Sequence, residues 1–237
     1  MTHFPSAGTL AAICVMAGAL LTTTGAKTRG IAQVSREWWR PAGTAAACVA
    51  ALVAAAFVAF GAAAELPLKS GYEAAGRGQT AAAERAFQRA VALRPWDSDV
   101  PRLAAQAFAE RTVTGDRMAG EAAVSWANRA MGKTPESVEA ASALAIGMIG
   151  SGGAEDAVPA LDEQIRRAPW TSELYLLRGL AKANLGLIPE AIVDVQRSSS
   201  LTPQPKRALT LLTGLYAAGG MPDKAAALQQ EIRRLDG

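Results

Sequence analysis

Few side chains in this sequence could take part in catalysis. The single histidine, His3, lies in the N-terminal tail. The remainder of the chain can therefore build neither a Ser-His-Asp nor a Cys-His arrangement, nor a metal site that uses histidine. We predict no catalytic residue, no metal site, no cofactor and no small-molecule substrate, and therefore a protein that is not an enzyme.

Two pairs of neighbouring carboxylates remain as candidates for acid–base chemistry, Glu155/Asp156 and Asp162/Glu163. Adjacent residues on a helix point in different directions, so neither pair converges on one proton. The stretch 150–153 is rich in glycine, but the Lys-Ser or Lys-Thr of a phosphate-binding loop does not follow it. We interpret the carboxylates as solvated surface and the glycines as a turn between two helices.

The composition predicts an all-α protein. Hydrophobic residues make up 50% of the chain and aromatic residues only 5%, so alanine, leucine and valine carry the apolar content. Alanine favours the helix more than any other residue. The aromatic and β-branched residues are too sparse, and alternate too poorly, to predict a sheet.

Three residue types recur with one period in the C-terminal half. Pro135, Pro169 and Pro203 are 34 residues apart, and two other sets keep the same spacing. These sets are Gly152, Gly186 and Gly220, and Ala157, Ala191 and Ala225. This period indicates units of two antiparallel helices, which must stack because one unit alone cannot bury its apolar face.

The residues within this period resemble the tetratricopeptide repeat (TPR) family. Its signature positions are occupied in the first unit by Gly71, Gly78, Ala83, Phe87, Ala90 and Pro95, and in the fourth by Tyr175, Gly179, Gly186, Ala191 and Pro203. The resemblance implies an α-solenoid of antiparallel helix pairs over residues 65–237, in about five units. The second unit departs from the pattern, since 40 residues separate Pro95 from Pro135. We expect a displaced first helix or a longer loop there.

The same resemblance implies a binding groove on the concave face, which the first helix of each unit forms. The corresponding positions are Leu68, Tyr72, Ser142, Ile146, Ile149, Leu176, Leu180, Asn184, Arg207, Thr210 and Gly214. This lining is largely apolar, which suits an amphipathic helix or an extended segment of a partner protein. The alternative is that these residues only pack the superhelix.

Two uncharged apolar stretches, at 7–26 and 42–64, have about the length that crosses a bilayer core. We predict two transmembrane helices that form a hairpin over residues 1–64. Its connecting loop, 27–41, carries four basic residues, Lys27, Arg29, Arg36 and Arg40, and basic loops stay in the cytoplasm. The repeats are then extracytoplasmic, anchored at the inner membrane. In an alternative interpretation, residues 42–64 belong to a cleaved signal peptide.

The charge distribution argues against nucleic-acid binding. The formal net charge is +3, and the excess of basic residues lies in the loop 27–41. From Glu65 onward, Lys and Arg balance Asp and Glu, which is a poor match for a phosphate backbone.

Two hypotheses about function follow. The first is a membrane-anchored TPR scaffold that mediates protein–protein interactions in the bacterial cell envelope. The alternative starts from the architecture, because a membrane hairpin followed by such repeats resembles the C-terminal part of O-antigen ligase and polymerase family proteins. That resemblance implies a fragment or an accessory piece of a glycan-transferring membrane enzyme.

Overall fold

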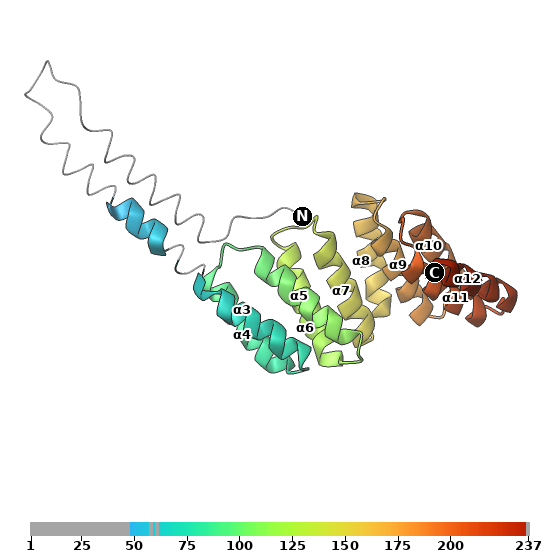
Figure 1. Cartoon of the computed structure of the whole chain (residues 1–237), viewed down its shortest axis with the longest axis horizontal. Coiled ribbons are helices and arrows are strands. Elements are labelled where there is room, and N and C mark those ends of the chain that lie inside the picture. Colours follow the sequence, from blue (N-terminus) through green and yellow to red (C-terminus); the bar gives the residue numbers. More distant parts are fainter. Residues whose placement is uncertain (1–47, 57–58, 60–61, 236–237) are drawn as a thin grey trace, which may run out of the picture. The chain divides into compact units, whose positions relative to one another are not determined.

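The computed structural model describes residues 48–56, 59 and 62–235. It divides the chain into two compact units, Met1–Leu66 and Pro67–Gly237. The second unit holds the helical repeats, apart from the first two residues of the first repeat helix, Glu65–Gly76. No strand occurs in the described residues, and the prediction of an all-helical repeat domain is confirmed (Figure 1).

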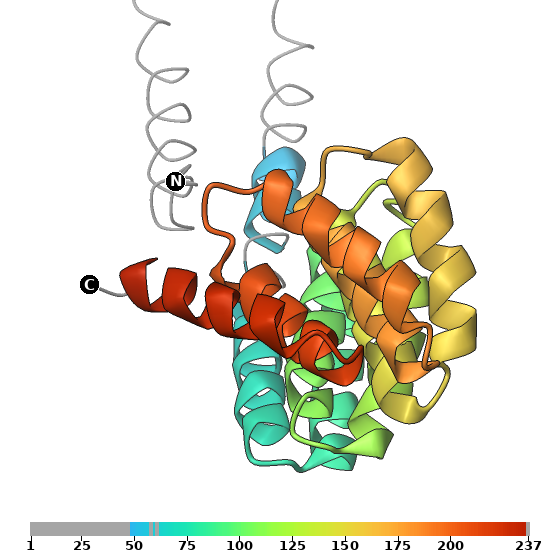
Figure 2. The same cartoon turned by 90° about the vertical axis from the view of Figure 1, so that its right-hand side faces the viewer.

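Within the described part of the chain, ten helices follow one another from Glu65 to Leu235 and form five pairs (Figure 1). The pairs are α3 (Glu65–Gly76) with α4 (Thr80–Leu93), α5 (Asp99–Thr112) with α6 (Arg117–Met131), α7 (Val138–Ser151) with α8 (Ala154–Arg167), α9 (Ser172–Asn184) with α10 (Ile188–Ser200), and α11 (Lys206–Ala218) with α12 (Pro222–Leu235). Figure 2, seen from the C-terminal end, shows α11 and α12 in front of the earlier pairs.

The prediction of two transmembrane helices needs correction. The first predicted span, 7–26, lies outside the described residues, as does the loop 27–41, and only part of the span 42–64 is described. Within the described residues, no helix is both long and apolar enough to cross a membrane. The repeat helices have at most 15 residues, whereas a span needs about 20 apolar ones.

Each pair turns at a glycine with a left-handed backbone, φ between 73° and 95°, a conformation that other residues rarely adopt. These glycines are Gly78, Gly115, Gly152, Gly186 and Gly220. The second unit therefore has an ordinary turn at Gly115, and α5 begins with Pro101 in its first turn, where proline is tolerated. The expected displacement of its first helix is wrong. The extra residues are distributed over helices of 14 and 15 residues and the turns that join them.

The stacked pairs bury three clusters of apolar side chains. An aromatic group fills the N-terminal cluster: Phe87 is fully buried and meets Tyr72, Phe108 and Trp126 edge to face, with ring centroids 5.6 to 6.1 Å apart. Aliphatic side chains make up most of the other two clusters, although Tyr216 is buried in the one that α9 to α12 form. Aromatic packing is thus concentrated in the first two units, and mainly aliphatic packing stabilises the others.

Candidate partner-binding groove

The first helices of successive pairs lie side by side, because α5 contacts α7, α7 contacts α9, and α9 contacts α11. These four helices form one face of the repeat domain, Pro67–Gly237, and the second helices of the pairs pack behind them. Two adjoining hollows open on this face. Each is lined by side chains from more than one first helix.

The larger hollow, which we call the acidic hollow, has a volume of about 570 Å³. Its lining comes from α5, α7, the first turns of α9 and α11, and Val113. The lining residues are Gln106, Ala109, Glu110, Val113, Val138, Glu139, Ser142, Ala143, Ile146, Glu173 and Arg207. Val113 is 77% exposed, so this hollow offers apolar surface to solvent beside three carboxylates.

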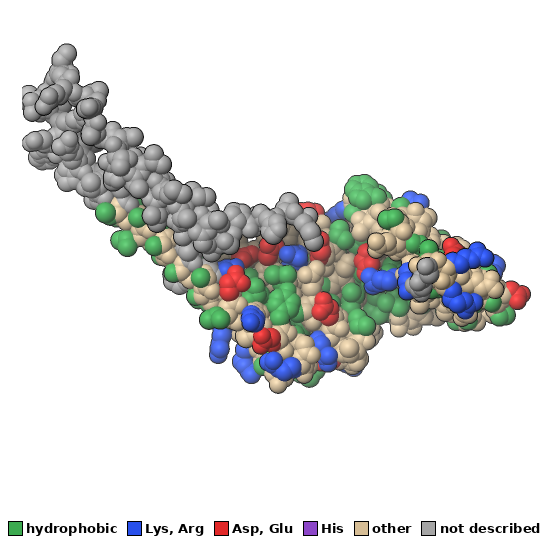
Figure 3. Space-filling view, in the orientation of Figure 1, with side chains coloured by type: hydrophobic (Ala, Val, Ile, Leu, Met, Phe, Trp, Pro, Cys, Tyr) green, Lys and Arg blue, Asp and Glu red, His purple; other side chains and the backbone are tan. Residues whose placement is uncertain are grey.

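The second hollow, which we call the leucine hollow, has a volume of about 490 Å³ and lies between α9 and α11. Its lining residues are Leu176, Leu177, Leu180, Lys206, Arg207, Thr210 and Leu211. Four leucines thus combine with two basic residues, which is the opposite charge to that of the acidic hollow. Figure 3 shows hydrophobic side chains over the middle of the repeat domain, with acidic and basic side chains among them.

An ion pair connects the two hollows. Arg207 lines both of them, and its guanidinium lies 3.2 Å from the Glu173 carboxylate. The two residues are 34 positions apart, so they occupy the same place in successive units. Because both side chains are at least partly exposed, this pair contributes little to stability and mainly separates the two charge environments.

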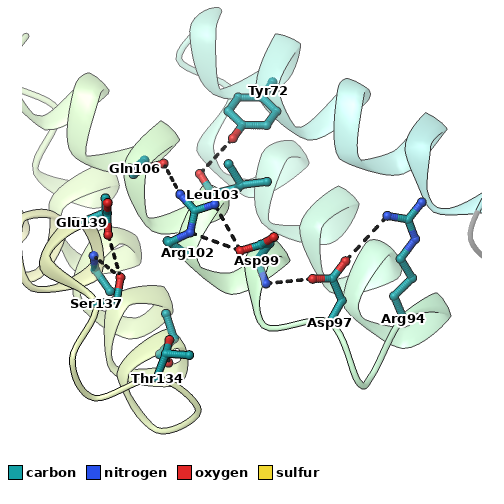
Figure 4. Close-up of polar contacts among 12 residues, drawn as sticks. Tyr72, Arg94, Asp97, Asp99, Arg102, Leu103, Gln106, Thr134, Ser137 and Glu139 are labelled. Carbon is teal, nitrogen blue, oxygen red and sulfur yellow. Dashed lines mark hydrogen bonds and ion pairs between the residues drawn. The ribbon is translucent and has the colours of Figure 1, made fainter. Parts of the chain in front are cut away.

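Figure 4 shows why Arg102 does not neutralise the acidic hollow. Its guanidinium donates hydrogen bonds to Asp99 at 3.2 Å and Gln106 at 3.4 Å, both on its own helix. The Glu139 carboxylate instead accepts a hydrogen bond from the Ser137 hydroxyl at 3.1 Å. Among the described residues, the Glu139 carboxylate thus accepts from a neutral hydroxyl and forms no ion pair.

The structure brings together six of the residues that the resemblance implied for the groove. Ser142 and Ile146 line the acidic hollow, while Leu176, Leu180 and Thr210 line the leucine hollow. Arg207 lines both hollows. These residues come from α7, α9 and α11.

The other residues lie elsewhere. Leu68 packs on the N-terminal core, and Ile149 packs on the core between α7 and α9. The Asn184 amide donates to the Leu180 carbonyl at 2.9 Å at the end of α9, and Gly214 is exposed on α11. Tyr72 packs edge-on against Phe87, and burial raises the pKa of its phenol although Arg102 opposes this shift. Tyr72 is 37% exposed, so its ring covers the edge of the aromatic cluster and lines neither hollow.

The sequence-based reasoning assigned no groove residue to the second unit. In the structure, α5 supplies Gln106, Ala109 and Glu110 to the acidic hollow. The sequence does contain a signal for the position of α5, because Gly115 lies midway between Gly78 and Gly152. If Gly115 is taken as the turn glycine of the second unit, the first helix of that unit must end just before it, as α5 does.

The candidate carboxylates serve the structure. Glu155 and Asp156 are exposed in the first turn of α8, as expected of solvated surface. Glu163 pairs with Arg166 and Arg167, and the hydrogen bond from Arg166 lowers the pKa of its carboxyl. Asp162 departs from the prediction, because it binds the guanidinium of Arg178 on α9. Within the described residues, no group of three or more potential metal ligands occurs.

Arg178 belongs to a charged cluster that sequence-based reasoning did not find. Its guanidinium also binds Asp194 through two hydrogen bonds, one of 2.9 Å, and Lys182 reaches the same carboxylate at 2.7 Å. Burial by itself lowers the pKa of Arg178, but the hydrogen bonds that it donates to Asp194 and Asp162 raise the pKa overall. This cluster connects α8, α9 and α10, and its ion pairs hold these three helices together.

Comparisons with known proteins identify the fold. No protein-family model and no curated protein match the chain. The TPR protein TTC0263 of Thermus thermophilus is similar, with 24% identity, 71% of this chain and 89% of that chain covered, and a TM-score of 0.54. A MamA structure from Desulfovibrio magneticus is similar with 19% identity, coverage of 73% and 94%, and a TM-score of 0.56. These likenesses show a TPR-like solenoid, a fold that generally mediates protein–protein interactions. They do not support the resemblance to O-antigen ligase or polymerase proteins.

Proposed function

We propose that this protein is an interaction scaffold that binds a segment of a partner protein along α5, α7, α9 and α11. The observation that carries the proposal is the pair of adjoining hollows on this face, which expose apolar side chains from successive first helices. An amphipathic segment can bury its apolar side in such a groove while its polar side stays in water.

The leucine hollow is the best place to test the proposal. Leu176 is only 8% exposed and packs in the core of α9 to α12, so changing it would disturb the fold as well as the groove. Leu180 lines the same hollow but is more exposed. Leu187 is 43% exposed, lies in the turn before α10 and lines neither hollow, which makes it a matched control.

We expect Leu180→Glu to reduce partner binding at least about tenfold, because it removes an apolar contact and the new carboxylate must lose water when the apolar side of the partner covers it. Crosslinking pulldowns from native extracts would quantify the recovered proteins for wild type, Leu180→Glu and Leu187→Glu. Proteins recovered with wild type and Leu187→Glu should be lost with Leu180→Glu. Equal recovery with all three variants would show that the groove only packs the fold.

A further inference from the structure

We infer that the partner segment is basic: it places an apolar side chain in the acidic hollow and carries Lys or Arg side chains on either side of it. This inference rests on the proposed function and specifies the chemistry of the partner. It follows from the carboxylates around the acidic hollow, because the structure pairs some of them with cations and leaves others without one.

The apolar part of the acidic hollow comes from two neighbouring first helices. Val113, which is 77% exposed, directly follows α5. Ile146 of α7 packs on the N-terminal core and is only partly buried, as is Val138 in the first turn of α7. An apolar side chain of the partner that covers these residues removes their apolar surface from water.

The cations near this apolar surface are already paired. Arg207 lines the acidic hollow, and its guanidinium lies 3.2 Å from the Glu173 carboxylate. A smaller hollow of about 220 Å³ shares Glu139 with the acidic hollow. The guanidinium of Arg102, which lines this smaller hollow, lies 3.2 Å from the Asp99 carboxylate (Figure 4). Each of the two cations therefore has a carboxylate of its own.

Three other carboxylates in these two hollows have no cation. Glu110 lines the acidic hollow, Glu136 lines the smaller hollow, and Glu139 lines both. In the part of the chain that the structure describes, none of the three forms an ion pair, and Glu139 accepts a hydrogen bond only from the neutral Ser137 hydroxyl. Lys and Arg side chains of a partner are the complementary groups.

The leucine hollow does not ask for the opposite charge. Neither of its basic residues is without a partner, since Arg207 pairs with Glu173 and Lys206 has an interaction as well. The carboxylates of the acidic end therefore decide the charge of the segment. Charge pairs at an exposed rim contribute more to specificity and association rate than to affinity. The basic residues of the segment thus select it, and its apolar contacts in both hollows supply the affinity.

A peptide selection on the full-length protein tests the inference. The probe is a displayed library of amphipathic peptides of about 15 residues, with leucine fixed at helical spacing and all other positions randomised. Peptides selected on wild type are then measured on Glu110→Gln/Glu139→Gln, which removes two charges and nearly keeps the side-chain volumes. The control, Glu155→Gln/Glu190→Gln, makes the same change of net charge in the first turns of α8 and α10, outside these hollows. Circular dichroism melting verifies that each variant is folded.

We expect wild type to enrich peptides in which Lys and Arg outnumber Asp and Glu and flank an apolar residue. Such peptides should bind Glu110→Gln/Glu139→Gln about fivefold to tenfold more weakly, and bind the control as tightly as wild type. Basic peptides that lose as much affinity for the control would overturn the inference, because net charge alone would then attract them.

Two further outcomes separate the inference from the proposed function. Enriched peptides without an excess of basic residues, whose binding is lost with Leu180→Glu, would overturn the basic partner and leave groove binding intact. If no enriched peptide distinguishes wild type from Leu180→Glu, both the inference and the proposed function fail.

Discussion

Asp194→Asn is expected to lower the free energy of unfolding by about 3 kcal/mol, because it removes the buried charge that two cations surround. The Asp194 side chain is only 5% exposed and binds Arg178 and Lys182. The asparagine has nearly the same volume, so packing is kept while Arg178 and Lys182 lose the charge that compensates their partial burial. Urea denaturation followed by circular dichroism measures the loss.

A matched control exists at the other carboxylate of the cluster. Asp162 binds the same guanidinium, but its side chain is 43% exposed. Water can solvate Arg178 from that side, so Asp162→Asn should cost less than about 1 kcal/mol. The double variant Arg178→Met/Asp194→Leu removes the buried Arg178–Asp194 pair but leaves Lys182 and Asp162 without their partners, so it should recover only part of the stability. Equal, small losses for Asp162→Asn and Asp194→Asn would show that burial does not strengthen the pair.

Gly147→Ala is expected to destabilise the protein by about 2 kcal/mol, although alanine favours a helix over glycine by roughly 1 kcal/mol. A Cβ at Gly147 of α7 would lie 2.8 Å from the carbonyl oxygen of Gly120 on α6 and 3.0 Å from the Ala123 Cβ. The obstacle is backbone, which cannot rotate away as a side chain can. The two helices would have to separate, and the surrounding core would lose contacts.

Gly214→Ala is the control for this effect, because Gly214 is also inside a first helix. No atom lies within 4 Å of a Cβ built there. The change should raise the free energy of unfolding by roughly 0.5–1 kcal/mol through helix propensity alone. Chemical denaturation of both variants gives the comparison. A Gly147→Ala protein as stable as wild type would mean that α6 and α7 can move apart without cost.

The repeat architecture was predictable because its signals are local and periodic. The 34-residue spacing of Pro135, Pro169 and Pro203 set the unit length, and Gly152, Gly186 and Gly220 indicated the turns. Each turn requires a left-handed residue, so glycine appears there whatever its neighbours do. The prediction of transmembrane helices depended on the hydropathy of 7–26 and 42–64. Among the described residues, no helix is long and apolar enough to cross a membrane.

The groove was predictable only in part. Family positions in α7, α9 and α11 placed Ser142, Ile146 and Leu180 at the hollows, because these units keep the regular period. Tyr72 lines neither hollow, because its ring packs edge-on against Phe87 while remaining 37% exposed. The family positions also gave nothing for α5, whose unit has a different length. Family positions therefore predict groove residues best in those units that keep the 34-residue spacing.

The sequence alone determined that the chain from Glu65 onward is helical and repeats in pairs, because helix propensity and turn glycines act locally. Only the tertiary structure decided which charges meet. Glu110, Glu139 and Arg207 come from three helices far apart in the chain, yet they line one hollow. Asp194 is buried only because α8, α9 and α10 pack around Arg178. Such contacts depend on how the helices stack, and no single period encodes that stacking.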